Sequence, residues 1–318
     1  MNGLYLAHGR LTYRTDLPQP EPSADEVLIQ VRLAGICSTD LEMVKGYVPE
    51  FEGVLGHEFV GEVVACAQQS WVGKRVVGSI NIGCGRCAVC LENGPEHCPT
   101  RSAVGIHHRD GVFAEYVTLP ITNLFAVPDG VDDETAVFTE PVAAAVRILE
   151  QVDAVAGLKT AVVGPGRLGL LIGQVLVQAG TNVTMIGRRE ASLTLPKAMG
   201  LTVALSNTLP ANSFDLVVEA TGNDAGFAQS LDLIRPLGTL VLKSTFTGQS
   251  NLNLTKIVVD EINVIGSRCG PFAPALQLLA QHKIDVNPMI DASYLFADGL
   301  RAFDHATKPG VRKVLLYP

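Results

Sequence analysis

The sequence predicts an α/β protein with a β-rich partner domain, and three observations support this fold class. Short β-type runs broken by Gly and Pro fill the chain up to about residue 135, as in a barrel-like all-β domain. After that point helical and strand patterns alternate, and the strands read as continuous apolar runs, which is typical of a doubly wound parallel sheet. A glycine-rich turn joins the first of these strands to the helix that follows it.

Length and composition are consistent with two folded domains. The 318 residues are about twice the length of a typical domain, and 47% are hydrophobic while 18% are charged, which is enough apolar material for large cores. The net charge of −8, from 24 basic and 32 acidic residues, disfavours generic binding to nucleic acid or to an anionic membrane.

The chain shows no sign of secretion or membrane insertion. His8 and Arg10 stand where a secretory signal would need an unbroken apolar core, and the most apolar helical stretch, LGLLIGQVLVQAG, is too short to cross a bilayer. Four of the seven cysteines are clustered, which favours metal ligation in a reducing compartment over disulfides. We therefore expect a cytoplasmic protein.

The elements follow in a simple order. The first region contains β-type runs at 26–35, 59–67, 74–82 and 113–120. The second region begins at 133–152 and then reads as strand 160–164, helix 167–180, strand 182–187, helix 190–200, strand 215–222, helix 224–238, and strands 239–244 and 261–267. A last helix at 274–283 and the strand RKVLLYP form a tail too short for a third domain, so the tail should return to the first. The predicted boundaries are 1–140, 141–267 and 268–318.

The glycine-rich turn predicts a dinucleotide site. Gly164, Gly166 and Gly169 form G-x-G-x-x-G between a predicted strand and a predicted helix, with Arg167 and Leu168 between the last two glycines. Glycines at this spacing allow a tight turn and a close approach to pyrophosphate, and the helix N-terminus supplies N–H donors.

The residues after the next strand indicate the cofactor. An acidic residue about 20 positions beyond the glycines would bind the ribose hydroxyls of NAD(H). Here Arg188 and Arg189 occupy that place, in MIGRRE. Two guanidinium groups suit a 2′-phosphate, so we expect NADP(H) to be preferred over NAD(H); ordinary surface arginines are the alternative.

The clustered cysteines predict a structural zinc site in the segment 82–99. Cys84, Cys87, Cys90 and Cys98 have the spacing C-x2-C-x2-C-x7-C. A closed four-thiolate site leaves no position for water or substrate, so it stabilises a loop and does no chemistry. An iron–sulfur cluster or free thiols are the alternatives.

A second set of metal ligands is scattered along the chain. Cys37 lies in GICSTD, His57 and Glu58 in GHEFVGEVV, and Glu140 at the junction of the two predicted domains. One thiolate, one imidazole and a carboxylate leave a fourth position open on zinc, which is the catalytic arrangement. Each residue alone would more often be part of the core.

In its motifs the chain resembles the zinc-dependent medium-chain alcohol/polyol dehydrogenases. G-H-E-x-x-G is present at Gly56–Gly61, G-x-C-x-[ST]-D at Gly35–Asp40, and the four-cysteine lobe, the G-x-G-x-x-G and the E-P junction follow in family order. The resemblance runs nearly end to end. It implies a GroES-like catalytic domain, a Rossmann domain, and two zinc ions per chain, one catalytic and one structural.

The resemblance also implies roles for single residues. Cys37, His57 and a carboxylate would bind the catalytic zinc, and the sequence leaves open whether that carboxylate is Glu58 or Glu140. Asp40 would hold the second nitrogen of His57, and Thr39 would relay the proton of the alcohol.

Several positions remain weaker candidates. Arg312 is expected to return to the cofactor pyrophosphate, and Arg268 with Cys269 to approach nicotinamide or substrate. His107 and His108 lie where family members approach the substrate pocket, although a solvated loop is the preferred interpretation.

The expected activity is hydride transfer between NADP(H) and an alcohol/carbonyl pair, with a polyol, sugar or small secondary alcohol as substrate. The resemblance also suggests a homo-oligomer, a dimer or a tetramer. Two alternatives are a zinc-free quinone or enoyl reductase on the same scaffold and a non-catalytic zinc-stabilised nucleotide-binding protein. The first would lack the set of Cys37, His57 and Glu140, and the second would hold one zinc per chain.

Overall fold

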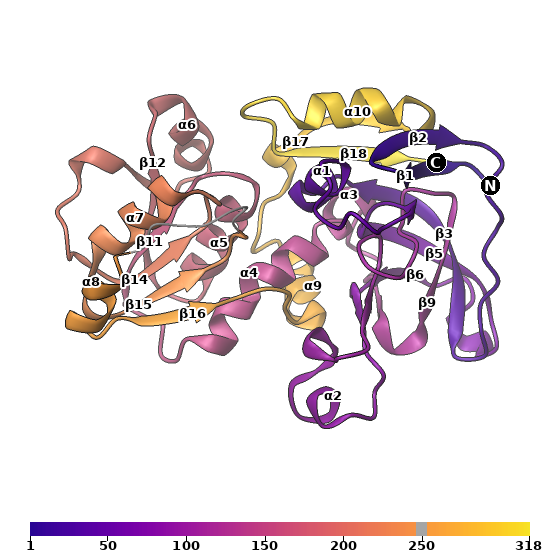
Figure 1. Cartoon of the computed structure of the whole chain (residues 1–318), viewed down its shortest axis with the longest axis horizontal. Helices are drawn as coiled ribbons and strands as arrows, with labels where there is room; N and C mark the ends of the chain where they lie inside the picture. The colour runs from indigo at the N-terminus through magenta and orange to yellow at the C-terminus, as the bar shows by residue number, and fades with distance from the viewer. Residues whose placement is uncertain (246–252) are drawn as a thin grey trace. The chain divides into compact units, whose positions relative to one another are not determined.

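The computed structural model describes residues 1–245 and 253–318, and the chain divides into two compact units (Figure 1). Unit 1 comprises Met1–Glu140 and Met289–Pro318, and unit 2 comprises Pro141–Pro288. Among the described residues no helix is both long enough and apolar enough to cross a membrane.

Unit 1 is rich in β-structure. Its strands are β1 (Gly3–Ala7), β2 (Arg10–Arg14), β3 (Glu26–Gly35), β4 (Gly53–Val54), β5 (Glu58–Cys66), β6 (Arg75–Gly78), β7 (Asn81–Ile82), β8 (Ser102–Ala103), β9 (Tyr116–Pro120), β10 (Leu124–Ala126), β17 (Ile290–Leu295) and β18 (Lys313–Tyr317). Its helices are α1 (Ser38–Val44), α2 (Ala88–Asn93), α3 (Asp133–Ala136) and α10 (Gly299–Ala306).

The strand β3 organises unit 1. It lies in a seven-stranded sheet of order β10-β6-β5-β3-β18-β17, and β9 also pairs with it. In its sequence EVLIQVRLAG only Gln30 and Arg32 are exposed, on either side of buried Val31, and the last three residues are all buried. The strand thus ends in the core, and the chain emerges from it at Ile36 and Cys37.

Unit 2 alternates strands and helices. Its strands are β11 (Lys159–Val163), β12 (Asn182–Gly187), β13 (Thr202–Leu205), β14 (Phe214–Glu219), β15 (Ile234–Leu242) and β16 (Asn263–Gly266). Its helices are α4 (Thr139–Gln151), which begins in unit 1, α5 (Arg167–Gln178), α6 (Glu190–Ala198), α7 (Asp224–Leu233), α8 (Leu254–Val259) and α9 (Phe272–Ala280).

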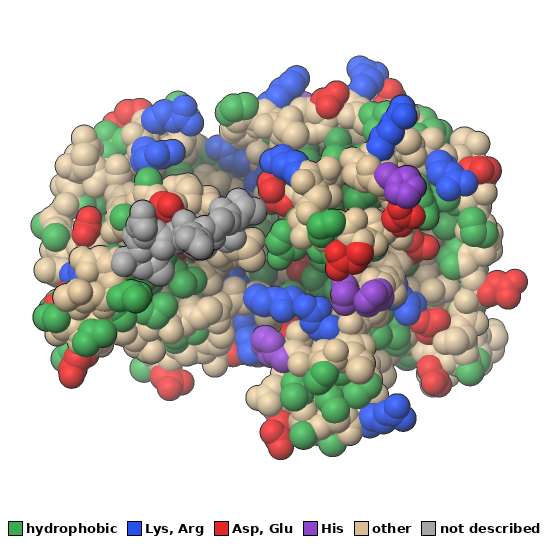
Figure 2. All heavy atoms as spheres, viewed as in Figure 1, with side chains coloured by type: hydrophobic (Ala, Val, Ile, Leu, Met, Phe, Trp, Pro, Cys, Tyr) green, Lys and Arg blue, Asp and Glu red, His purple; other side chains and the backbone are tan. Residues whose placement is uncertain are grey.

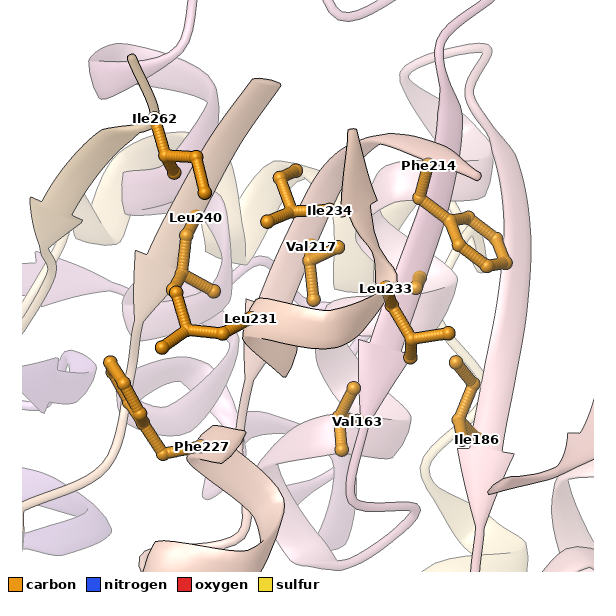
Figure 3. Close-up of a cluster of buried hydrophobic side chains, with 11 residues drawn as sticks. Val163, Ile186, Phe214, Val217, Phe227, Leu231, Leu233, Ile234, Leu240 and Ile262 are labelled. Atoms are coloured by element: carbon orange, nitrogen blue, oxygen red, sulfur yellow. The ribbon is translucent and has the colours of Figure 1, made fainter. Parts of the chain in front are cut away.

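The sheet of unit 2 is the doubly wound parallel sheet that the sequence predicts. Its order is β13-β12-β11-β14-β15-β16, and every neighbouring pair is parallel. Apolar side chains from β14, α7 and β15, among them Phe214, Val217, Leu231 and Leu240, form one buried cluster (Figure 3). The strand order changes direction between β11 and β14, which is where such sheets bind nucleotides.

Two expectations about unit 2 are corrected. The helix expected at 224–238 ends at Leu233, and β15 begins at the next residue because Pro236 lacks the N–H that a continuing helix needs. Residues 268–288, expected in the returning tail, belong to unit 2. The Gln174 side chain exchanges two hydrogen bonds with the backbone of Asp285, which ties this segment to α5.

Candidate functional site

The first candidate ligand, Cys37, caps the N-terminus of α1. The Asp40 carboxylate accepts a hydrogen bond from the backbone N–H of Cys37 at 2.8 Å and closes the first turn. The Thr39 Oγ1 lies 3.8 Å from the Cys37 sulfur. The turn therefore brings a thiol, a hydroxyl and a buried carboxylate together within four residues of sequence.

His57 and Glu58 approach this turn from the start of β5. Gly56 has φ +94°, and a Cβ there would lie 2.4 Å from the Phe113 ring, so the turn before His57 requires glycine. Glu58 is paired with Gly35 in the register of β5 against β3. Because Gly35 lies two residues before Cys37, the ends of the two strands bring His57 and Glu58 beside the thiol.

Asp40 also orients the imidazole. His57 is 3% exposed and Asp40 fully buried, and His57 Nδ1 lies 3.2 Å from Asp40 Oδ1. Burial lowers the pKa of His57, but the Asp40 carboxylate and the Cys37 sulfur raise it by more, so that pKa lies well above its usual range. With Nδ1 turned to Asp40, Nε2 is the ring nitrogen left for a metal.

These residues fit a metal ion. One ligand atom from each of Cys37, His57 and Glu58 lies within 4.8 Å of the other two. A thiolate, an imidazole and a carboxylate are the donors that zinc accepts in open sites. Glu140, in the first turn of α4, is partly exposed and does not belong to this set.

A residue that we did not predict faces Glu58. The Lys313 ammonium forms an ion pair with Glu58 Oε2, and both side chains are buried, at 4% and 1% exposure. The two residues are 255 positions apart in the chain, so no local motif joins them. One feature of the sequence could have indicated this pair: a lysine begins the apolar run KVLLY, and a buried strand rarely carries an unpaired charge.

The four-cysteine lobe brings its sulfurs together as expected for a closed site. All four lie within 4.8 Å of one another, and the Cys84–Cys90 and Cys87–Cys98 sulfur pairs are both 4.0 Å apart. Tetrahedral zinc with bonds of about 2.3 Å separates its sulfurs by about 3.8 Å. The backbone N–H of Cys84 donates to the Cys98 sulfur and lowers the pKa of Cys98 to about 6, which favours the thiolate that a metal needs.

The glycine loop has the geometry of a phosphate cradle. Gly164 has φ +105°, and a Cβ at Gly169 would lie 1.9 Å from the Gly164 carbonyl oxygen, so both positions require glycine. A Cβ at Gly166 would meet no atom within 4 Å, and Gly166 caps α5 without a side-chain acceptor. Open space therefore lies over the N-terminus of α5, where Arg167 and Leu168 begin the helix.

Replacing Gly169 by alanine tests this loop. The added methyl must displace the Gly164 carbonyl, so we expect the cofactor KM to rise at least about tenfold with little change in zinc content. Gly130→Ala, where a Cβ would meet nothing, is the matched control. Equal cofactor KM values for Gly169→Ala and Gly130→Ala would contradict this account of the loop.

The arginines expected at the end of β12 lie on the surface. Arg188 and Arg189 are exposed, directly before α6, and within the described part of the chain neither forms an ion pair with a carboxylate. Figure 2 shows basic side chains on the surface over α6. The structure also shows a residue that the motif did not indicate: buried Glu219 accepts the N–H groups of Thr221 and Gly222 and shapes the turn against which Gly164 packs.

The remaining candidates are spread over both units. Arg268 is exposed after β16 in unit 2, with Cys269 beside it, and the Arg268 carbonyl accepts a hydrogen bond from Lys243. Arg312 lies in unit 1, where its N–H is bound by Asp291. His107 and His108 line a cavity of about 270 Å³ in unit 1 whose rim also carries Glu50 and Asp110.

Comparison with known sequences decides the family. The profile described as "Alcohol dehydrogenase GroES-like domain" matches residues 23–129, and the one described as "Zinc-binding dehydrogenase" matches residues 168–281. The sorbitol dehydrogenase of Halalkalibacterium halodurans is 32% identical, over 95% of this chain and 94% of its own. The chain belongs to the zinc-dependent medium-chain alcohol/polyol dehydrogenase family.

Further relatives agree with this family assignment. The L-threonine 3-dehydrogenase of Escherichia fergusonii is 29% identical over 96% of this chain and 95% of its own. A crystal structure of a zinc-binding dehydrogenase from Sinorhizobium meliloti bound to NADP superposes with a TM-score of 0.92 at 29% identity, covering 100% of this chain and 99% of that one. This member of the family is therefore an alcohol or polyol dehydrogenase, with a GroES-like unit 1 and a Rossmann-type unit 2.

Proposed function

We propose that this dehydrogenase binds two zinc ions and catalyses the reversible oxidation of an alcohol to a carbonyl with NADP as the hydride acceptor. The observation that carries the proposal is the set of Cys37, His57 and Glu58, whose ligand atoms lie within 4.8 Å of one another beside the buried Asp40. The second zinc would be held by Cys84, Cys87, Cys90 and Cys98 and would stabilise the lobe.

The roles of the site residues follow from their positions. Zinc bound by Cys37, His57 and Glu58 would supply Lewis-acid polarisation of the substrate oxygen. Asp40 keeps Nδ1 of His57 occupied and fixes the ring orientation. The Thr39 hydroxyl, beside the Cys37 sulfur, is placed to accept the proton of the alcohol and pass it outward. Glu140 lies outside the ligand set, so it would influence the metal without binding it directly.

The preference for NADP rests on Arg188 and Arg189. Both are exposed just beyond β12, at the place where an acid would otherwise meet the ribose. Gly164, Gly166 and Gly169 would receive the pyrophosphate at the N-terminus of α5. We also propose Arg268 and Arg312 as further cofactor contacts.

A polyol, a sugar or a small secondary alcohol is the proposed substrate class. The relatives named sorbitol dehydrogenase and L-threonine 3-dehydrogenase support a small polar substrate. The cavity lined by His107, His108, Glu50 and Asp110 offers hydrogen-bond donors and acceptors of the kind that recognise hydroxyl groups.

The test is hydride transfer, followed by the absorbance of the reduced nicotinamide. NADP and NAD are compared in parallel over polyols, sugars, secondary alcohols and L-threonine, with zinc measured in the same protein. Turnover that favours NADP, with two zinc ions per chain, supports the proposal. A preparation with one zinc per chain and no turnover would instead favour a non-catalytic nucleotide-binding protein.

Reversing the charge at the two arginines tests the cofactor preference. In the double variant Arg188→Glu and Arg189→Glu, we expect the KM for NADP to rise about 10- to 100-fold while the KM for NAD changes little, because charged hydrogen bonds contribute about 1.5–3 kcal/mol. Lys283→Glu, an exposed position of the same unit, controls for the change in net charge. An unchanged ratio of the two KM values would overturn the NADP assignment.

A further inference from the structure

The first residue of β18, Lys313, is buried against the proposed catalytic set. The Lys313 side chain is 4% exposed, and its ammonium is paired with Oε2 of Glu58, whose side chain is 1% exposed. Lysine is almost never fully buried unless it is paired. The ammonium also lies 5.2 Å from the centroid of the Phe138 ring. One carboxylate and one aromatic face therefore enclose this cation.

The sheet makes room for this contact at one glycine. Gly35, on the strand between β5 and β18, pairs with Glu58 on one side and with Leu315 on the other. A Cβ at Gly35 would lie 2.7 Å from Glu58 Oε2 and 3.3 Å from Lys313 Cδ. Because position 35 has no side chain, Lys313 reaches across β3 to the carboxylate.

The same carboxylate belongs to the metal-ligand set. Glu58 has two oxygens, and Lys313 holds Oε2, so one oxygen is left without this restraint. Lys313 also balances the charge of Glu58, so it lowers the net negative charge that the ligand set presents to a metal. A divalent cation bound by these ligands is therefore attracted less strongly than it would be without the lysine.

We propose that Lys313 is a positioning residue that restricts Glu58 to ligation of the catalytic zinc through one oxygen and thereby moderates the zinc affinity. The inference rests on the proposed zinc site and extends it to a residue outside the ligand set. A carboxylate held in this way leaves a coordination position open for the alcohol, which catalytic zinc sites require. The buried ion pair is thus part of the function of the site as well as of its packing.

The variant Lys313→Met tests this role, because it keeps an unbranched buried side chain and removes the charge. We expect the Cys37-set zinc to bind at least about tenfold more tightly in competition with a chelator, because a positive charge close to the divalent cation has been removed. The kcat should fall while the KM for the cofactor stays the same. In the Co(II)-substituted protein the visible absorption should weaken, as the coordination number rises from four to five.

Three further variants separate this role from packing. Lys313→Arg should keep the wild-type zinc affinity and cobalt spectrum, because the charge remains. Glu58→Gln with Lys313→Met removes both buried charges and should bind zinc less tightly than Lys313→Met, because the carboxylate that the lysine restrains is gone. Lys74→Met, an exposed lysine 4.9 Å from the centroid of the Trp71 ring, should behave as wild type.

The result that overturns the inference is a Lys313→Met protein with unchanged or weaker zinc binding and an unchanged cobalt spectrum, even if it is less stable. Failure of the proposed function is recognised separately. If the wild type holds only the zinc of the four-cysteine lobe, the proposed catalytic site fails. If the wild type holds two zinc ions and Lys313→Met binds them as the wild type does, the role of Lys313 alone fails.

Discussion

Replacing Cys37 by serine is expected to lower kcat/KM at least about 1,000-fold and to remove one of two zinc ions per chain. Metal polarisation of the substrate oxygen supplies several kcal/mol to the transition state, and each 1.4 kcal/mol is a factor of ten in rate. Serine keeps the size of the side chain, and the Asp40 contact at this turn is to the backbone N–H, so the fold should persist. Steady-state kinetics, metal analysis and circular dichroism together measure this outcome.

Cys66→Ser is the matched control for the change at Cys37. Cys66 is half-buried at the end of β5 and belongs to neither cysteine set, so two zinc ions and near-normal turnover are expected. A Cys37→Ser enzyme that retained turnover close to that of Cys66→Ser would show that Cys37 does not hold a catalytic metal.

Replacing Cys98 by serine should have the opposite effect to the change at Cys37: the protein should lose much of its stability, while its turnover changes little. The other zinc ion should be lost, and the lobe around α2 should become sensitive to protease. Cys98 is 3% exposed, whereas most of the lobe around it is not buried, so the lobe depends on its metal more than on a core of its own. A loss of about 3 kcal/mol would lower Tm by roughly 6–12 °C.

The control for the lobe is Leu91→Ala. Leu91 lies in α2 between two of the ligands and is 73% exposed, so its truncation should change neither zinc content nor Tm measurably. Turnover of the Cys98→Ser protein below its Tm should stay within a few-fold of wild type. If that turnover were lost while the Cys37-set zinc stayed bound, the lobe would have a role in catalysis and would not be purely structural.

The parts of the fold that the sequence predicted are those determined by patterns of neighbouring residues. The alternation of apolar runs and helical segments predicted the parallel sheet, and GPGRLG predicted the turn before α5. The spacing of Cys84, Cys87, Cys90 and Cys98 likewise predicted a cluster whose sulfurs lie within 4.8 Å of one another. In each case neighbouring residues determine the geometry, so one stretch of sequence carries the information.

The rest depends on contacts between distant residues. The sequence offered both Glu58 and Glu140 as carboxylates, and the structure groups only Glu58 with Cys37 and His57 among the described residues. The Lys313 pair depends on the register of β18 against β3, which no window of sequence specifies. The chain returns to unit 1 at Met289, and this boundary depends on the packing of residues 268–288 within unit 2.

The position of β18 in the chain has a consequence for biosynthesis. The strand β3 and its partners β5 and β9 are complete by residue 120, while β18 spans Lys313–Tyr317, much later in the sequence. As the chain leaves the ribosome, the N-terminal part can fold early, but Ala34 and Gly35 of β3 lack their β18 partners and Glu58 stays without its cation. Residues translated long after β3 therefore complete the surroundings of the proposed metal site, and a chain terminated before Lys313 lacks both the strand and the lysine.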